Sequence, residues 1–399
     1  MKILMASHYF ASHRGGVEVV AEQLFRALTE EDQEVVWMAS NATPPPEPVG
    51  RSRPLPLPAF NLVEEKIGMP FPIPTAGALR TITREAGNAE ILILHDCLYL
   101  SNILAFLAAR WRGIPTMIVQ HTRFFPNATH VMNVVIGLAT TIVTRPMLSR
   151  AAQVVFIGET TRKSFARLRF KNPPELVFNG VDTNLYRRLE GSETKSALRR
   201  EYGLPEDGTL ILFVGRFVEK KGISIMQRMV KLRPDWTWVF AGWGPLDPAS
   251  WNAPNVRVLC GLWGPSLAAL YRCCDLLVLP TIGEGFPLVV QEALASGMPV
   301  VCGEETLGAD PAMGAFVAGA QVFLGDEDRT AREFLSAIGE TLASGAGSSD
   351  ESEERRAFAV SRYSWHRAAG RYLEIVSRLV PRAAAEAAGA EGYIGEKRP

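Results

Sequence analysis

The chain has few cysteines, no excess of charge of either sign and no long apolar run. Five cysteines occur in 399 residues and none form a CxxC pair, which predicts reduced thiols, no disulfide framework and no zinc site. Lys plus Arg and Asp plus Glu both number 42, so the net charge gives no reason to expect nucleic-acid binding. No run of 18 apolar residues occurs, and the first ten residues lack the form of a signal peptide. We therefore expect a cytoplasmic protein without a spanning helix.

Short apolar runs alternate with helical patterns along the whole chain. Hydrophobic residues make up 47% of the sequence, enough for a large core. The runs are continuous rather than alternating, which is typical of parallel strands covered by helices on both faces. The pattern predicts an α/β protein with doubly wound, Rossmann-like sheets. The expected strands are 2–7, 34–40, 91–95, 115–121, 153–158, 175–179, 209–215, 237–241, 256–260, 276–280, 299–302 and 321–324.

A segment rich in turn formers, NGVDTNLYRRLEG at 179–191, divides the chain into two halves. We expect one domain over 1–185, joined by a C-terminal helix and tail over 364–399, and a second domain over 186–363. Residues 44–74 contain ten prolines, and we expect a long loop there without strands or helices.

The segment EGFPLVVQEALASGMPVV at 284–301 holds two glutamates eight residues apart, Glu284 and Glu292. Following an expected strand, it predicts a tight turn and a helix that begins near Pro287. The free amides of Leu288 and Val289 at that helix start can hold a phosphate, and Glu292 can accept hydrogen bonds from a ribose diol. An ordinary acidic helix start with an exposed glutamate is the simpler alternative.

Two further segments point to phosphate binding. GRFVEKKG at 215–222 places Arg216 and Lys221 after a strand end, where two cations suit a diphosphate; the alternative is a solvated basic turn. HRGGVE at 13–18 places Gly15 and Gly16 between the first strand and the first helix, where the backbone can approach an anion closely.

Together these motifs resemble those of the family 4 glycosyltransferases, which have the GT-B fold. The shared segments are Gly15-Gly16, NGVD at 179–182, GRFVEKKG, AGWGP at 241–245 and the block from Glu284 to Glu292. The resemblance implies two Rossmann-like domains facing a cleft, with the C-terminal helix at 364–380 crossing back to the first domain. The sequence departs from the family pattern at CGEETLGADPAMG, 302–314, a loop that borders the expected donor pocket.

The resemblance also implies a function. It is the transfer of a hexose-type sugar from a UDP- or GDP-sugar to an acceptor hydroxyl, with retention and without a metal or other cofactor. The implied catalytic residues are His121, Glu284, Arg216 and Lys221, and the implied donor-binding residues are Gly15, Gly16, Arg216, Lys221, Glu284, Phe286, Leu288, Val289 and Glu292. A nucleotide-sugar epimerase and a non-catalytic nucleotide-sugar-binding module are the alternatives.

Two patterns leave other choices open. Asp326-Glu327-Asp328 has the form of a metal–nucleotide motif, but acidic residues also favour helix starts. Residues 99–175 carry ten Lys/Arg and two Asp/Glu around the apolar segment 131–148. That segment is either a peripheral membrane contact serving a lipid-linked acceptor or an interior helix with a solvated basic rim.

Overall fold

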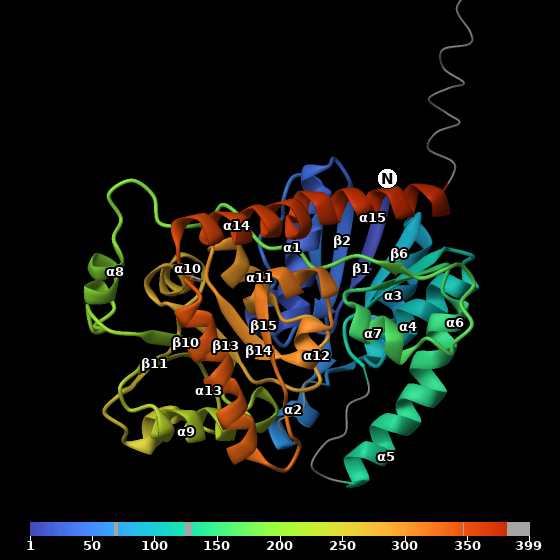
Figure 1. The fold of residues 1–399 in the computed structure, drawn as a ribbon. Helices are drawn as coiled ribbons and strands as arrows, with labels where there is room; N and C mark the ends of the chain where they lie inside the picture. Colours follow the sequence, from blue (N-terminus) through green and yellow to red (C-terminus); the bar gives the residue numbers. More distant parts are fainter. Residues whose placement is uncertain (68–70, 124–129, 346, 381–399) are drawn as a thin grey trace, which may run out of the picture. The chain divides into compact units, whose positions relative to one another are not determined.

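The structure is a computed structural model that describes residues 1–67, 71–123, 130–345 and 347–380. It divides into two compact units (Figure 1). Of the described residues, those within 1–157, 161–177 and 365–380 form unit 1, and those within 158–160 and 178–364 form unit 2. The C-terminal helix therefore belongs with the first half of the chain, which confirms the predicted crossing.

Seven parallel strands form the sheet of unit 1, in the order β3-β2-β1-β6-β7-β8-β9. The chain runs outward in both directions from the neighbouring strands β1 and β6, so the sheet is doubly wound. The strands are β1 (Lys2–Ala6), β2 (Glu34–Ser40), β3 (Arg53–Leu57), β6 (Ile91–His95), β7 (Thr116–Gln120), β8 (Gln153–Phe156) and β9 (Glu175–Leu176). A small antiparallel pair, β4 (Ala59–Phe60) and β5 (Ile73–Pro74), lies outside the sheet.

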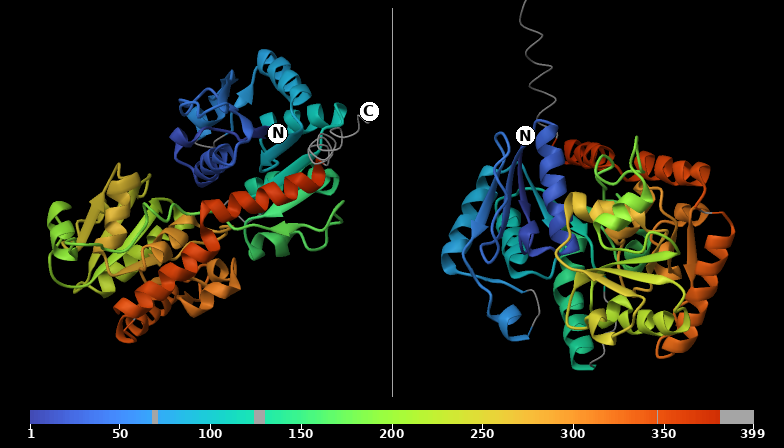
Figure 2. Two further views of the ribbon diagram at one scale, coloured as in Figure 1. Left: turned by 90° about the horizontal axis from the view of Figure 1, so that it is seen from above. Right: turned by 90° about the vertical axis from the view of Figure 1, so that its left-hand side faces the viewer.

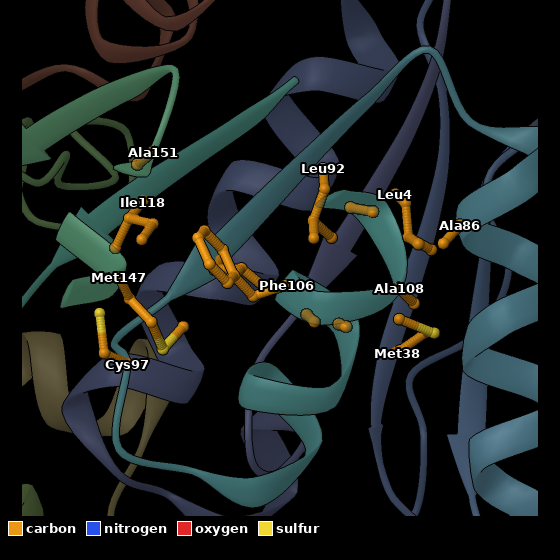
Figure 3. Packing of buried hydrophobic residues seen from close by; sticks show 14 of the residues in the cluster. Leu4, Met38, Ala86, Leu92, Cys97, Phe106, Ala108, Ile118, Met147 and Ala151 are labelled. Carbon is orange, nitrogen blue, oxygen red and sulfur yellow. The ribbon is translucent and has the colours of Figure 1, made fainter. Parts of the chain in front are cut away.

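Helices cover both faces of this sheet. On one face, α3, α4 and α6 close a core with Phe106 near its centre (Figure 3). Elsewhere in unit 1, α15 packs on α1, and Arg378 of α15 pairs with Glu175 of β9 at 2.6 Å. The helices are α1 (Gly16–Glu30), α2 (Leu62–Ile67), α3 (Ala76–Asn88), α4 (Leu100–Trp111), α5 (His130–Ala139), a π-helical turn (Thr140–Thr144), α6 (Arg145–Arg150), α7 (Glu159–Ser164) and α15 (Trp365–Leu379).

Unit 2 repeats the scheme with six parallel strands in the order β12-β11-β10-β13-β14-β15. Its central pair, β10 and β13, is again the point from which the chain winds outward. The strands are β10 (Leu210–Arg216), β11 (Thr237–Trp243), β12 (Val256–Leu259), β13 (Leu276–Leu279), β14 (Val300–Gly303) and β15 (Val317–Ala320). The helices are α8 (Lys195–Glu201), α9 (Ile223–Leu232), α10 (Gly264–Cys273), α11 (Leu288–Ala295), α12 (Glu304–Leu307), α13 (Glu327–Ala343) and α14 (Ser349–Tyr363). Both units are drawn from other directions in Figure 2.

Three expectations about the fold need correction. The proline-rich segment is not free of regular structure, because it contains the edge strand β3; an edge strand tolerates prolines whose missing N–H lies on the open side. The strand expected at 321–324 is wrong: the strand is β15, four residues earlier, and Phe323 instead hydrogen-bonds Thr330 at the start of α13. The change between units falls at residues 177/178 rather than 185/186, because Phe178 packs on Phe286 and Tyr363 of unit 2.

Candidate active site

In unit 2, the loops after β10 and β13 meet at the topological switch point. Gly222, which ends the first loop, has a φ of +77°, and a Cβ there would lie 2.5 Å from the carbonyl oxygen of Pro280. The amide of Ile282 donates to the carbonyl of Lys220 at 3.1 Å. Only a glycine permits this approach, and the approach brings the predicted basic and acidic motifs together.

Lys221 and Glu284 form an ion pair across these two loops, with side chains 19% and 14% exposed. Arg216, at the end of β10, is exposed, and no carboxylate of the described residues lies within ion-pair distance of it. The surrounding chain desolvates the ammonium of Lys220 enough to lower its pKa although its side chain is exposed; Glu284 opposes this shift, and Lys221 and Arg216 add to it. Arg216, Lys221 and Glu284 therefore lie close enough for their charges to interact at the switch point of unit 2.

The helix start also matches the prediction. Pro287 is the N-cap of α11, and Leu288 and Val289 are its first two residues. Phe286 differs from the expectation: its side chain is buried and packs edge-on against Phe178 and Tyr363. The ring of Phe286 is thus closed off from a ligand.

Glu292, one turn into α11, sits in a cluster with two tyrosines. The hydroxyl of Tyr271 donates to Oε2 of Glu292 at 2.6 Å, and Tyr186 is a second hydrogen-bonding neighbour. Burial raises the pKa of Glu292, and the hydrogen bonds from the two tyrosines oppose that rise. Glu292, the residue predicted to bind the donor ribose, is therefore held in place by the hydroxyl groups of two tyrosines.

The acidic motif Asp326-Glu327-Asp328 forms the start of helix α13. Asp326 is its N-cap and accepts a hydrogen bond from the amide of Arg329 at 2.9 Å. Glu327 and Asp328 lie 3.7 and 3.5 Å from the guanidinium of Arg228. Within the described parts of the chain, no three His, Cys, Asp or Glu side chains are grouped as metal ligands.

In unit 1, the glycine loop after β1 already holds a carboxylate. A Cβ on Gly15, the N-cap of α1, would lie 2.1 Å from Oε2 of Glu18, whereas one on Gly16 would meet nothing within 4 Å. Glu18 is 3% exposed, and Nε2 of His8 and Nδ1 of His13 each lie 3.0 Å from its Oε1. Burial by itself raises the pKa of Glu18, but the hydrogen bonds from His13 and His8 hold it well below its usual range. The helix start where an anion was expected is thus occupied by the protein's own anion.

His13 extends this network to α2. Its Nε2 lies 2.8 Å from Oε1 of Glu64, and the hydroxyl of Tyr9 donates to Oε2 of the same carboxylate at 2.7 Å. Burial by itself lowers the pKa of His13, but hydrogen bonds and charge from Glu18 and Glu64 raise it overall. A charged network therefore ties the proline-rich segment to the glycine loop.

His121 lies just past β7, beside the end of β6. Its amide donates to Oδ1 of Asp96 at 2.9 Å, and its Nε2 lies 3.0 Å from Nδ1 of His95. Burial lowers the pKa of His121, with Asp96 and Glu18 opposing and His8 adding to the shift. Nε2 of His95, Oδ2 of Asp96 and Nδ1 of His8 are buried without a hydrogen-bond partner among the described residues. These atoms form a polar centre at the switch point of unit 1.

Of the residues in these two networks, the sequence motifs predict His121, Gly15 and Gly16. They do not predict the roles of His8, Glu18, Glu64, His95 and Asp96. The signal for His8, His95 and Asp96 was their position within two residues of the ends of β1 and β6. Asp96 also has a φ of +65°, which is uncommon outside glycine and marks a position that the surroundings hold in place. Glu64 has no local signal, because its partner His13 is 51 residues away.

Comparison with known proteins finds glycosyltransferase family models over both halves of the chain. Residues 14–185 match the model of Glycosyltransferase Family 4, and residues 194–343 match that of the Glycosyl transferases group 1. The chain is a glycosyltransferase with the GT-B fold. A relative named D-inositol 3-phosphate glycosyltransferase, from Salinispora arenicola, is 28% identical over 72% of this chain and 71% of its own.

Solved structures share the fold of this glycosyltransferase. Sucrose-phosphate synthase from Thermosynechococcus elongatus has a TM-score of 0.73 at 17% identity, over 95% of this chain and 99% of its own. HepE from Anabaena, solved with UDP-glucose, has a TM-score of 0.69 at 17% identity, over 95% of this chain and 100% of its own.

Proposed function

We propose that this glycosyltransferase moves a hexose-type sugar from a UDP- or GDP-sugar to an acceptor hydroxyl, with retention of anomeric configuration and without a metal or other cofactor. The observation that carries the proposal is the Lys221–Glu284 ion pair beside Arg216 at the switch point of unit 2. The UDP-glucose bound to HepE supports a nucleotide-sugar donor.

Each residue of the unit 2 centre has a role in this proposal. As the bond between C1 of the sugar and the diphosphate breaks, negative charge grows on the leaving oxygen, and Arg216 and Lys221 stabilise it. The amides of Leu288 and Val289 add the positive end of α11. Glu284 accepts hydrogen bonds from hydroxyls of the sugar, and Glu292 accepts them from the ribose.

Unit 1 supplies the acceptor side. The unpartnered polar atoms of His8 and Asp96, close to His121, can bind hydroxyl groups of a carbohydrate or of a lipid-linked sugar. The acceptor oxygen forms the new bond to C1, and its proton leaves with the diphosphate. The name of the Salinispora relative supports a polyol hydroxyl as the acceptor. We place the reaction in the cytoplasm. If the acceptor is lipid-linked, the reaction takes place at the inner face of the membrane.

The test is to incubate the full chain with UDP- and GDP-hexoses and a panel of acceptors that includes inositol phosphates. We expect release of nucleoside diphosphate, a glycoside detected by mass spectrometry, and retained configuration by NMR. EDTA should leave the rate unchanged. A new nucleotide sugar formed without acceptor would indicate the epimerase, and binding without turnover would indicate the binding module. Activity lost in EDTA and restored by Mg²⁺ or Mn²⁺ would refute the metal-free mechanism.

A further inference from the structure

The segment around α5 is not the interior helix that one reading of the sequence favoured. Val134, Val135 and Leu138 of α5 are 55%, 56% and 57% exposed, and Ile142 in the following π-helical turn is 63% exposed. Leu138 lies four residues after Val134 and three after Val135, so its side chain neighbours both on the helix surface, and the three form an apolar stripe. We call these four residues the α5 face.

The α5 face stands clear of the core of its unit. Val143, Met147 and Leu148 pack into the core beside α4, and they anchor the far end of this helical segment. From there α5 extends away from the sheet of unit 1, as Figure 1 and the right-hand view of Figure 2 both show. Four large apolar side chains at the end of a projecting helix are typical of an interaction surface.

The charge around this face selects the partner. Residues 97–158 contain no Asp or Glu, while Arg145 and Arg150 follow the α5 face and are exposed. The same face of a second copy carries the same two arginines, so a symmetric contact through it would bring like charges together. An anionic phospholipid bilayer offers both an apolar layer and negative headgroups. No helix of the described residues is long and apolar enough to cross a membrane.

We propose that unit 1 docks on anionic phospholipid bilayers by inserting the α5 face at the interface, with Arg145 and Arg150 paired to lipid phosphates. This docking proposal does not depend on the proposed transfer reaction, because binding to a bilayer needs neither donor nor acceptor. It also deepens the proposed function, since a docked unit 1 would meet a lipid-linked acceptor at the membrane surface.

The experiment is vesicle co-sedimentation of the full chain without substrates. Vesicles of phosphatidylcholine with phosphatidylglycerol should bind the protein, and vesicles of phosphatidylcholine alone should bind it far less. Leu138→Ser with Ile142→Ser should weaken binding roughly tenfold or more. Arg145→Gln and Arg150→Gln should each weaken it roughly fivefold, on anionic vesicles only.

The matched control is Leu232→Ser with Leu324→Ser, which removes two exposed leucines of unit 2 (51% and 73% exposed). This control should bind vesicles as the unchanged chain does, and thermal melts should show that every variant is folded. Equal binding by the α5 variants, or no binding to anionic vesicles, would overturn the proposal. So would a wild-type dimer in light scattering that Leu138→Ser converts to monomer, because a second copy would then cover the face. Failure of the glycosyltransferase assay alone would leave the docking result standing.

Discussion

Lys221 and Glu284 pair across loops that follow two different strands, β10 and β13. The pair fixes the ammonium group at the switch point before any ligand arrives. A fixed cation needs no reorganisation when charge develops on a leaving diphosphate, which is why such groups contribute strongly to catalysis. Arg216 is the last residue of β10 and lies at the same edge of the sheet.

Replacing either cation should therefore slow the reaction. We expect Arg216→Ala and Lys221→Ala each to lower turnover by about 10²–10³, the range for loss of one preorganised donor. Initial rates of nucleoside-diphosphate release measure this. Lys231→Ala, on the exposed side of α9, is the control for a changed charge and should retain the wild-type rate. Near-normal rates in both site variants would remove the cations from the mechanism.

That Arg216, Lys221 and Glu284 would lie close together in unit 2 could be predicted from the sequence, because each motif is local. Arg216, Lys221 and Glu284 each follow a continuous apolar strand, and the strand ends of a parallel sheet converge on one edge. The packing of Phe286 could not be foreseen, because its partners Phe178 and Tyr363 lie 108 residues before and 77 residues after it. Burial of that ring depends on how distant segments meet.

The fold shows the same division between local and distant causes. Strands with continuous apolar runs, such as β6 and β13, were predicted within a residue of their bounds. The edge strand β3 was missed because its prolines argue against a strand, and only its pairing with β2 makes them acceptable. The Glu18 carboxylate under Gly15 was missed for a related reason: its partners are fixed by the folded loop and not by spacing alone.

Glu292 provides a test in which stability and binding change in opposite directions. Burial raises its pKa, so the folded protein binds this proton more tightly than the unfolded chain does. Stability then falls as pH rises from the unfolded pKa through the folded one. Glu292→Gln should therefore raise the melting temperature at pH 7, and the difference should shrink towards about pH 4.

The same substitution should weaken nucleotide binding by roughly tenfold or more, since a charged hydrogen-bond acceptor for the ribose is lost. Thermal melts and calorimetric titration with UDP and GDP measure the two effects. Glu333→Gln, an exposed glutamate of α13, should change neither. A variant that melts lower at pH 7 would show that burial does not dominate at Glu292.

His13 makes the tie between the glycine loop and α2 sensitive to pH. Its pKa is raised in the folded state, where Glu18 and Glu64 outweigh the effect of burial. Its contribution to stability is therefore complete below the unfolded pKa of about 6.5 and is lost as pH rises through the folded pKa. The free energy of unfolding of the wild type should exceed that of His13→Gln by roughly 1 kcal/mol at about pH 6, and by progressively less towards pH 9. Urea denaturation across this pH range measures the stability difference between the two proteins. A difference that does not change with pH would contradict the raised pKa of His13.

His95 is a positioning residue for His121. Both rings are buried, and the 3.0 Å contact between Nδ1 of His95 and Nε2 of His121 sets the orientation of the second ring. Burial holds the pKa of each below its ordinary value, so one neutral ring donates and the other accepts. We expect His95→Ala to lower kcat roughly 10-fold to 100-fold through misplacement of His121, with little change in the KM for the donor.

His95→Asn separates positioning from simple packing, because an amide can still hydrogen-bond His121 while filling less of the space. Partial recovery of kcat in His95→Asn, relative to His95→Ala, is the expected result. His121→Ala should be at least as slow as His95→Ala, and the double variant should be no slower than His121→Ala, since both changes act through the same ring. Steady-state kinetics alongside thermal melts provide the readout. If His95→Ala lowers only the melting temperature and keeps the wild-type kcat, then His95 serves the core of unit 1 and not the reaction.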